Sequence, residues 1–207
     1  GDWSSDVCSS DLYMIYQKGS TISSCDLSRP NRTASTTTAG VYMTTGAFGN
    51  LVENNRIHNY FDAMPTNTST MYGVYEATGG TATDITRVIN NVIYNINSNG
   101  SIYGIYNTTA AYENIYHNTI SLDYTAATAG LAYGVYQTGS ATNINVRNNV
   151  ITIARGGTGA KVGLFYATAA SGIISNNNAV YLNSAGTGAQ SYGTSVAVAY
   201  ATLANWQ

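Results

Sequence analysis

Charged residues are scarce in this chain of 207 residues. Only 9% of its residues are Asp, Glu, Lys or Arg, with eight basic side chains against ten acidic ones. The chain has no basic cluster that could neutralise phosphates, which argues against nucleic-acid binding. No apolar run approaches the roughly 18 residues of a membrane-spanning helix. We therefore expect neither a nucleic-acid partner nor a membrane span.

Proline, cysteine and helical periodicity are also nearly absent. The chain has two prolines and two cysteines, and apolar residues do not recur at helical spacing. Asn, Thr, Ser, Gly and Ala fill the sequence, together with 18 tyrosines. This composition is typical of extended, hydrogen-bonded β structure and unlike that of disordered segments. Nothing in it indicates a cofactor or a metal site.

A short phrase built around glycine recurs along the chain. Its glycines are separated by 33, 31, 30, 29 and 30 residues. A fixed period of this size predicts a repeat architecture such as a solenoid. The copies are Ala39-Gly40-Val41-Tyr42, Tyr72-Gly73-Val74-Tyr75, Tyr103-Gly104-Ile105-Tyr106, Tyr133-Gly134-Val135-Tyr136, Val162-Gly163-Leu164-Phe165 and the degraded Tyr192-Gly193-Thr194-Ser195.

A second phrase, Asn-Asn-x-Ile, falls between the glycine phrases. Apolar residues alternate on both sides of it, as in strands with one buried face. The Asn pair interrupts this alternation and predicts a tight corner, since Asn tolerates left-handed backbone angles. The clearest copies are Asn54-Asn55-Arg56-Ile57, Asn90-Asn91-Val92-Ile93, His117-Asn118-Thr119-Ile120, Asn148-Asn149-Val150-Ile151 and Asn177-Asn178-Ala179-Val180.

Each period thus holds a strand, a corner, a second strand, a loop, the glycine-phrase strand and another loop. Leucine-rich repeats need far more Leu, and propeller blades are longer and built from antiparallel hairpins. One period buries too few side chains to fold alone, so stacking in parallel must supply the core. We predict an all-β parallel solenoid of about six coils over residues 13–207.

The pattern resembles the right-handed parallel β-helix of the pectin-lyase-like superfamily, whose coils carry a ladder of stacked Asn at one corner. That resemblance assigns the ladder to Asn55, Asn91, Asn118, Asn149 and Asn178, with Cys25 in the first copy. The stretch Ser28-Arg29-Pro30-Asn31-Arg32, the Tyr-Gly-Val-Tyr strands and the closing residues 202–207 are similar to segments of large bacterial surface proteins. The resemblance implies a secreted or cell-surface location, further β-helix coils, a sorting domain, and truncation at both ends.

The first twelve residues, GDWSSDVCSSDL, carry no trace of the repeat. They resemble a short-read sequencing adapter translated in one frame, so we expect a non-native segment without regular structure. Leaving them out removes three of the ten acidic residues and moves the formal charge from −2 to about +1. Cys8 goes with them, so no intrachain disulfide is predicted for Cys25.

An aromatic column is the strongest candidate binding feature. Alternation places the residue after each glycine inward, so the glycine and the following aromatic should face outward. Glycines beside a row of exposed rings would form a shallow trough suited to sugar rings. The alternative is a ring ladder that only stabilises the sheet. The column comprises Tyr42, Tyr75, Tyr106, Tyr136 and Phe165.

Charge is densest in the first two turns, where Asp26 should lie in register with Arg56. Lyases of this fold pair carboxylates, often around calcium, with an Arg or Lys base; Asp26 and Glu53 with Arg29 or Arg56 would take these roles. Two carboxylates are few for Ca²⁺, which takes six to eight oxygen ligands, and a surface ion pair is the simpler interpretation.

The superfamily's hydrolase motifs Asn-Thr-Asp, Asp-Asp and Gly-His-Gly do not occur, and His58 is interpreted as a lone histidine. We therefore expect a non-catalytic structural or adhesive segment, with polysaccharide or cell-surface glycan as a partner. The alternative is a polysaccharide lyase or glycoside hydrolase of the same fold, with its active coils missing or near Asp26 and Arg56.

Overall fold

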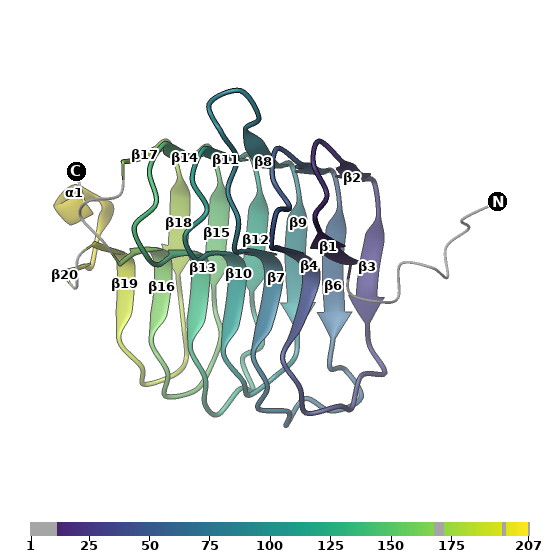
Figure 1. Cartoon of the computed structure of the whole chain (residues 1–207). Helices are drawn as coiled ribbons and strands as arrows, with labels where there is room; N and C mark the ends of the chain where they lie inside the picture. Colours follow the sequence, from purple (N-terminus) through teal and green to yellow (C-terminus); the bar gives the residue numbers. More distant parts are fainter. Residues whose placement is uncertain (1–11, 168–171, 196–197, 207) are drawn as a thin grey trace.

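The computed structural model describes residues 12–167, 172–195 and 198–206. Over these residues the chain winds into a parallel β-helix, and each full coil adds one strand to each of three sheets (Figure 1). Two of these sheets have six strands, which confirms the predicted all-β solenoid of about six coils.

The first sheet contains the glycine phrases. Its strands pair in parallel except at the end, where the last one runs antiparallel to its neighbour. In spatial order they are β1 (Leu12–Ile15), β4 (Thr38–Thr44), β7 (Met71–Glu76), β10 (Ile102–Asn107), β13 (Ala132–Gln137), β16 (Lys161–Tyr166), β19 (Gln190–Ser195) and β20 (Val198–Tyr200).

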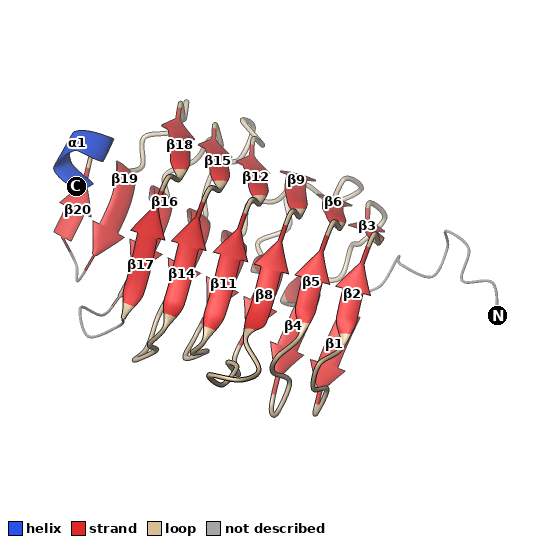
Figure 2. Cartoon of the chain, turned by 90° about the horizontal axis from the view of Figure 1, so that it is seen from above, coloured by secondary structure: helices blue, strands red, loops and turns tan. Residues whose placement is uncertain are grey.

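The second and third sheets meet at the Asn corner (Figure 2). A four-residue helix, α1 (Leu203–Trp206), follows β20. The second sheet consists of β2 (Thr21–Ser23), β5 (Leu51–Glu53), β8 (Thr86–Ile89), β11 (Glu113–Tyr116), β14 (Ile144–Arg147) and β17 (Ile173–Asn176), and the third of β3 (Asp26–Arg29), β6 (Arg56–Tyr60), β9 (Val92–Ile96), β12 (Thr119–Leu122), β15 (Val150–Ile153) and β18 (Ala179–Leu182).

The core is a set of stacked apolar columns inside the coil. Ile120 lies between Ile93 and Ile151 in the third sheet, and all three are fully buried. Ile115 lies between Val88 and Val146 in the second sheet. Each inward side chain therefore packs against its counterparts in the coils on either side, which is how stacking supplies the core that one coil lacks.

The two residues of the Asn pair have different roles at the corner. The first residue takes the left-handed backbone conformation in every copy, with φ between 55° and 58° at positions 24, 54, 90, 117, 148 and 177. The second residue turns its side chain into the coil and forms the ladder. His117 thus occupies an exposed corner position, and only its neighbour Asn118 is buried.

The ladder of asparagines runs unbroken from Asn55 to Asn178. The Oδ1 of Asn118 accepts from the backbone N–H and the Nδ2 of Asn91, each at 3.0 Å. Its Nδ2 donates to the Oδ1 of Asn149 at 3.0 Å and to the carbonyl of Val88 at 2.8 Å. Four hydrogen bonds thus satisfy one buried amide. Asn91 and Asn149 repeat the pattern. Asn55 forms three of the four bonds.

At its two ends the ladder is hydrogen-bonded to groups other than ladder asparagines. The N–H of Cys25 donates to the Oδ1 of Asn55 at 2.9 Å, so cysteine fits the first position without an amide of its own. At the other end, the Nδ2 of Asn178 donates to the Oγ of Ser175, and the Tyr192 hydroxyl donates to the Asn178 carbonyl.

The first strand begins at Leu12, one residue before the boundary expected from the sequence. Leu12 pairs with Val41 and packs against the core. The other residues of the adapter-like segment, 1–11, lie outside the described residues, and the expectation about their structure stays a prediction.

The inward and outward assignments can be tested at one pair of neighbours in β12. Ile120→Asp buries an unpaired carboxylate and should cost several kcal/mol, about 3 or more. Thr119→Asp, on the exposed side of the same strand, should change the stability by less than about 0.5 kcal/mol. Chemical denaturation followed by circular dichroism measures both. Equal losses would mean that the register is wrong by one residue.

Candidate functional site: the tyrosine face

The predicted aromatic column exists and lies on the outer side of the first sheet. Its rings stack nearly parallel, with interplanar angles from 2° to 8°. Centroid distances along Tyr42, Tyr75, Tyr106, Tyr136 and Phe165 are 4.2, 5.3, 5.0 and 4.4 Å. Tyr13 extends the stack by one ring at 4.8 Å. The in-register strands set this spacing.

A second column, formed by Tyr72, Tyr103 and Tyr133, runs beside the first. Its rings stack at 5.2 Å and meet the first column edge to face, for example at 5.0 Å between Tyr103 and Tyr106. Stacked and edge-to-face pairs are both favourable arrangements of aromatic rings. We call the two columns together the tyrosine face.

The glycines between the columns point inward, which corrects the expectation that they face outward. Gly104 and Ile105 are consecutive buried residues, so the alternation shifts by one position at the glycine. A Cβ on Gly104 would lie 2.7 Å from the Cγ2 of Ile120 and 2.6 Å from the carbonyl oxygen of Gly134. Glycine is therefore required by core packing, and both flanking tyrosines face outward. The expected trough floored by glycine backbone does not form.

The stacking of the rings determines which of their atoms a ligand could contact on the tyrosine face. Each inner ring of a column has both faces against its neighbours, so along most of the surface the ring edges and hydroxyls are accessible. Burial raises the pKa of Tyr42 to about 12, and the neighbouring Tyr75 adds to the rise. Burial likewise raises the pKa values of Tyr103 and Tyr106. The hydroxyls therefore stay neutral at physiological pH.

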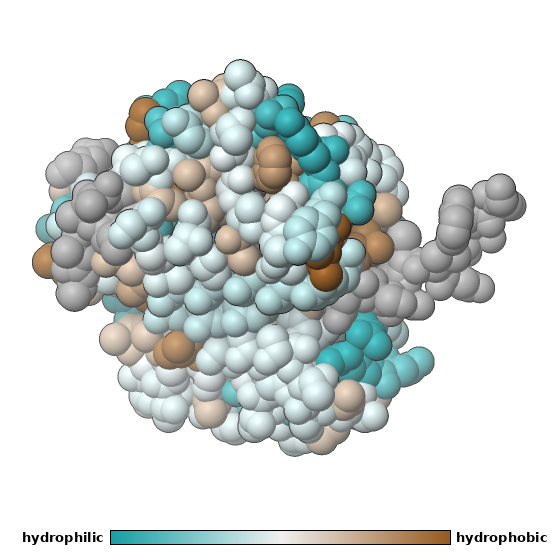
Figure 3. Space-filling model, viewed as in Figure 1, coloured by the Kyte–Doolittle hydropathy of each residue, from teal (hydrophilic) through white to brown (hydrophobic). Residues whose placement is uncertain are grey.

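The tyrosine face is also free of charged side chains. Strands β4, β7, β10, β13 and β16 contain two charged residues, Glu76 and Lys161, and both are fully buried. The space-filling view shows this side of the molecule as largely pale, of near-neutral hydropathy across its middle (Figure 3). The surface therefore suits an uncharged, hydrogen-bonding ligand better than an anionic one.

The charged group predicted at the first turns forms on a different face, in the third sheet. Asp26 pairs in register with Arg56, as expected, and their side chains form an ion pair. Glu53 lies in the second sheet, and Arg29 lies opposite Tyr60 in the third. The structure therefore brings Asp26 and Arg56 together but not the full predicted set.

His58 belongs to this group and is not a lone histidine. Its Nε2 lies 2.6 Å from the Oδ1 of Asp26, and its ring stacks on Tyr94 at 4.8 Å. The second ring nitrogen, Nδ1, is buried without a hydrogen-bond partner in the described part of the chain. In this structure Asp26 therefore engages one ring nitrogen of His58, and the other is buried.

Four charged side chains are buried at positions that the sequence analysis did not single out. Arg155 donates to the carbonyls of Gly100 at 2.8 Å and Gly130 at 3.0 Å, so it ties together the loops of consecutive coils. Burial lowers the pKa of Arg155 to about 10, which leaves it charged at neutral pH. The other three are Lys161, Glu76 and Glu113.

A signal for Glu76 was present in the repeat. In three consecutive copies the residue after the last tyrosine of the phrase is polar, in register and buried: Glu76, Asn107 and Gln137. A column of polar residues at one fixed position of the repeat marks a buried polar corner.

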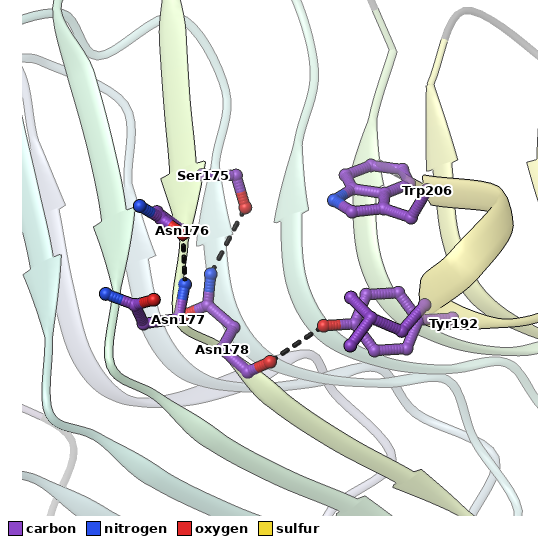
Figure 4. A pocket seen from close by; sticks show the side chains of 7 residues that line it. Ser175, Asn176, Asn177, Asn178, Tyr192 and Trp206 are labelled. Carbon is purple, nitrogen blue, oxygen red and sulfur yellow. Dashed lines mark hydrogen bonds between the residues drawn. The ribbon is translucent and has the colours of Figure 1, made fainter.

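A hollow opens at the C-terminal end of the stack (Figure 4). It lies between the last corner and α1 and is lined by Ser175, Asn176, Asn177, Asn178, Tyr192, Leu203 and Trp206. Trp206 packs against Gly193, taking the place that Ile120 takes over Gly104 in an inner coil. The Tyr192 hydroxyl in its wall is already bonded to the Asn178 carbonyl.

No protein-family model, curated protein or solved structure matches this chain. Within the described ranges, no group of three or more His, Cys, Asp or Glu side chains could hold a metal ion. The helix there, α1, is far too short to cross a membrane.

The inward position of the glycines can be tested by adding one methyl group. Gly104→Ala should cost about 1–3 kcal/mol, because the new Cβ overlaps Ile120 and a backbone oxygen. Gly172→Ala is the matched control, since its nearest atom would lie at an ordinary 3.5 Å. Thermal unfolding of both variants measures the difference. A neutral Gly104→Ala variant would place the glycines on the outer surface.

Proposed function

We propose that the chain is a non-catalytic, structural or adhesive β-helix segment that contacts neutral glycans through its tyrosine face. The observation that supports this most is the tyrosine face itself, an uncharged surface that repeats once per coil. Its rigidity follows from in-register stacking and from the Asn ladder behind it. A rod of this kind holds binding groups at fixed intervals.

The proposal places the chain among right-handed parallel β-helices of the pectin-lyase-like type, in a bacterial secreted or cell-surface protein. The buried Asn ladder, the three parallel sheets and the period of about thirty residues support that placement. We also propose that the segment before β1 derives from a sequencing adapter. The full protein would contain further coils and a sorting domain.

The glycan we propose is neutral and lies along the helix axis. Neighbouring rings of the first column are 4.2 to 5.3 Å apart, comparable with the length of one sugar unit in an extended polysaccharide. Sugar hydroxyls would exchange hydrogen bonds with phenolic hydroxyls, which both donate and accept. An acidic polysaccharide would find no basic partner on this surface.

The enzyme alternative has less support. Asp26, Arg56 and His58 lie together, but they satisfy one another, and the second nitrogen of His58 is shielded. Catalysis needs titratable groups that converge on a bound substrate in a concave pocket. The buried pair Glu76 and Glu113 is inaccessible to any polysaccharide.

Affinity electrophoresis in gels containing soluble polysaccharides tests the proposal. The purified chain should be retarded by a neutral β-glucan or xylan and not by polygalacturonate. Tyr75→Ala with Tyr106→Ala should abolish the retardation while circular dichroism stays β-rich. Tyr75→Phe with Tyr106→Phe keeps the stack and removes two hydroxyls, so it should weaken binding as well.

Tyr181→Ala is the matched control, because Tyr181 is exposed on the third sheet, away from the tyrosine face. Retardation that survives the loss of Tyr75 and Tyr106 would reduce the tyrosine face to a stabilising ladder. Release of unsaturated sugars by the wild-type chain, lost in Arg56→Ala, would establish the enzyme alternative instead.

A further inference from the structure

Two carboxylic acids lie side by side inside the solenoid, and they play no part in the proposed glycan contact. Glu76 ends β7 and Glu113 begins β11 in the next coil. Neither residue has any exposed surface. Asn107 lies in register with Glu76 and donates to the carboxyl of Glu113, so both carboxyl groups lie at the same interior corner between the first and second sheets, where they interact.

The surroundings supply a single donor to this pair. The Nδ2 of Asn107 donates to one oxygen of Glu113 and also to the carbonyl of Ala110 at 2.9 Å. Both oxygens of Glu76 and the second oxygen of Glu113 have no hydrogen-bond partner among the described residues. Carboxylates only accept hydrogen bonds, so two ionised groups placed here would face each other without a donor between them.

The strand neighbours of the pair carry no positive charge. In register with Glu76 lie Met43 of β4 and Asn107 of β10, and in register with Glu113 lie Thr86 of β8 and Ile144 of β14. All four are neutral. Two unpaired negative charges in a buried, apolar corner would strongly destabilise the fold. Keeping one carboxyl protonated removes one of these charges and lowers that free energy.

We propose that Glu76 and Glu113 share one proton in the folded protein and form an acid-stabilised fastening between adjacent coils. The protonated carboxyl donates to its ionised neighbour, so the coil of Glu76 is joined to the coil of Glu113 by one O–H···O⁻ hydrogen bond. The pair acts as a pH-sensitive element: the solenoid is firmest in mildly acidic surroundings and is loosened at this corner as the pH rises.

The direction of the effect follows from the shifts. Burial, and then the proximity of Glu113, raise the pKa of Glu76 well above its ordinary value. Burial also raises the pKa of Glu113, although its interaction with Glu76 and the hydrogen bond from Asn107 oppose the rise. A carboxyl with a raised pKa stabilises the fold fully below its unfolded pKa of about 4.3. That stabilisation is lost as the pH rises through the folded pKa, at up to about tenfold in the folding equilibrium per pH unit.

Thermal unfolding of the full chain between about pH 5 and pH 9 tests the proposal. The melting temperature of the wild type should fall as the pH rises. Glu76→Gln supplies a permanent amide donor to Glu113, so its melting temperature should depend much less on pH and exceed that of the wild type at pH 8. Glu113→Gln should behave in the same way. Glu53→Gln, on a partly exposed residue of β5, is the matched control and should keep the wild-type slope.

A second measurement does not depend on the melting transition. Infrared spectra at pH 7 should contain the carbonyl band of a protonated carboxyl, and this band should disappear in Glu76→Gln. A wild-type melting temperature that is level or rises with pH would overturn the proposal, as would a wild-type slope in Glu76→Gln. Stabilisation at pH 8 by added calcium, seen in the wild type and lost in Glu76→Gln, would show that a cation neutralises the pair instead of a proton.

Discussion

Every feature of this molecule depends on the in-register pairing of each coil with the next. The pairing places like residues on top of one another, so a side chain that suits one coil must also suit contact with its own counterpart. Isoleucine meets this condition in the core, tyrosine on the outer face and asparagine at the corner. The ladder is the most demanding case, because an asparagine there is buried and must find partners for both ends of its amide. A neighbouring asparagine supplies them in both directions along the axis.

The repeat made the architecture predictable from sequence. The period identified a solenoid, and the alternation around Asn118 located Ile115 and Ile120 in the core, where the structure places them. The ladder residues followed from the resemblance to known β-helices. These predictions succeed because a repeated phrase reports the same packing environment several times over, which removes the ambiguity of a single short strand.

The sequence predictions failed where they relied on local rules and not on comparison of the repeated phrases. Strict alternation predicted an outward Gly104, whereas packing against Ile120 turns the glycine inward and shifts the alternation by one residue. His58 was interpreted as isolated because its partner Asp26 lies 32 residues away, on the neighbouring strand of the preceding coil. Glu113 gave no signal of its own: its partner Glu76 lies in another sheet, and only the three-dimensional corner brings them together.

The tyrosine face is a structural arrangement to which we also assign the proposed recognition. The rings that stabilise the sheet by stacking also line up hydroxyls at the interval of the coils, without any charged residue among them. Of the charged residues that the sequence suggested for catalysis, Asp26 and Arg56 form an ion pair with each other. Arg155, which the sequence did not suggest, bonds to backbone carbonyls. These polar side chains therefore connect one coil to another.

The most direct test of the account is the stability lost when one rung of the ladder is removed. Asn118→Ala deletes four hydrogen bonds and leaves the buried N–H of Asn91 without an acceptor, so the free energy of unfolding in denaturant should fall by about 3 kcal/mol or more. Asn145→Ala, which removes a partly buried amide bonded to Asn114 outside the ladder, should cost less than about 1 kcal/mol. Equal losses in the two variants, or an unchanged stability in Asn118→Ala, would contradict the claim that the ladder holds the coils in register.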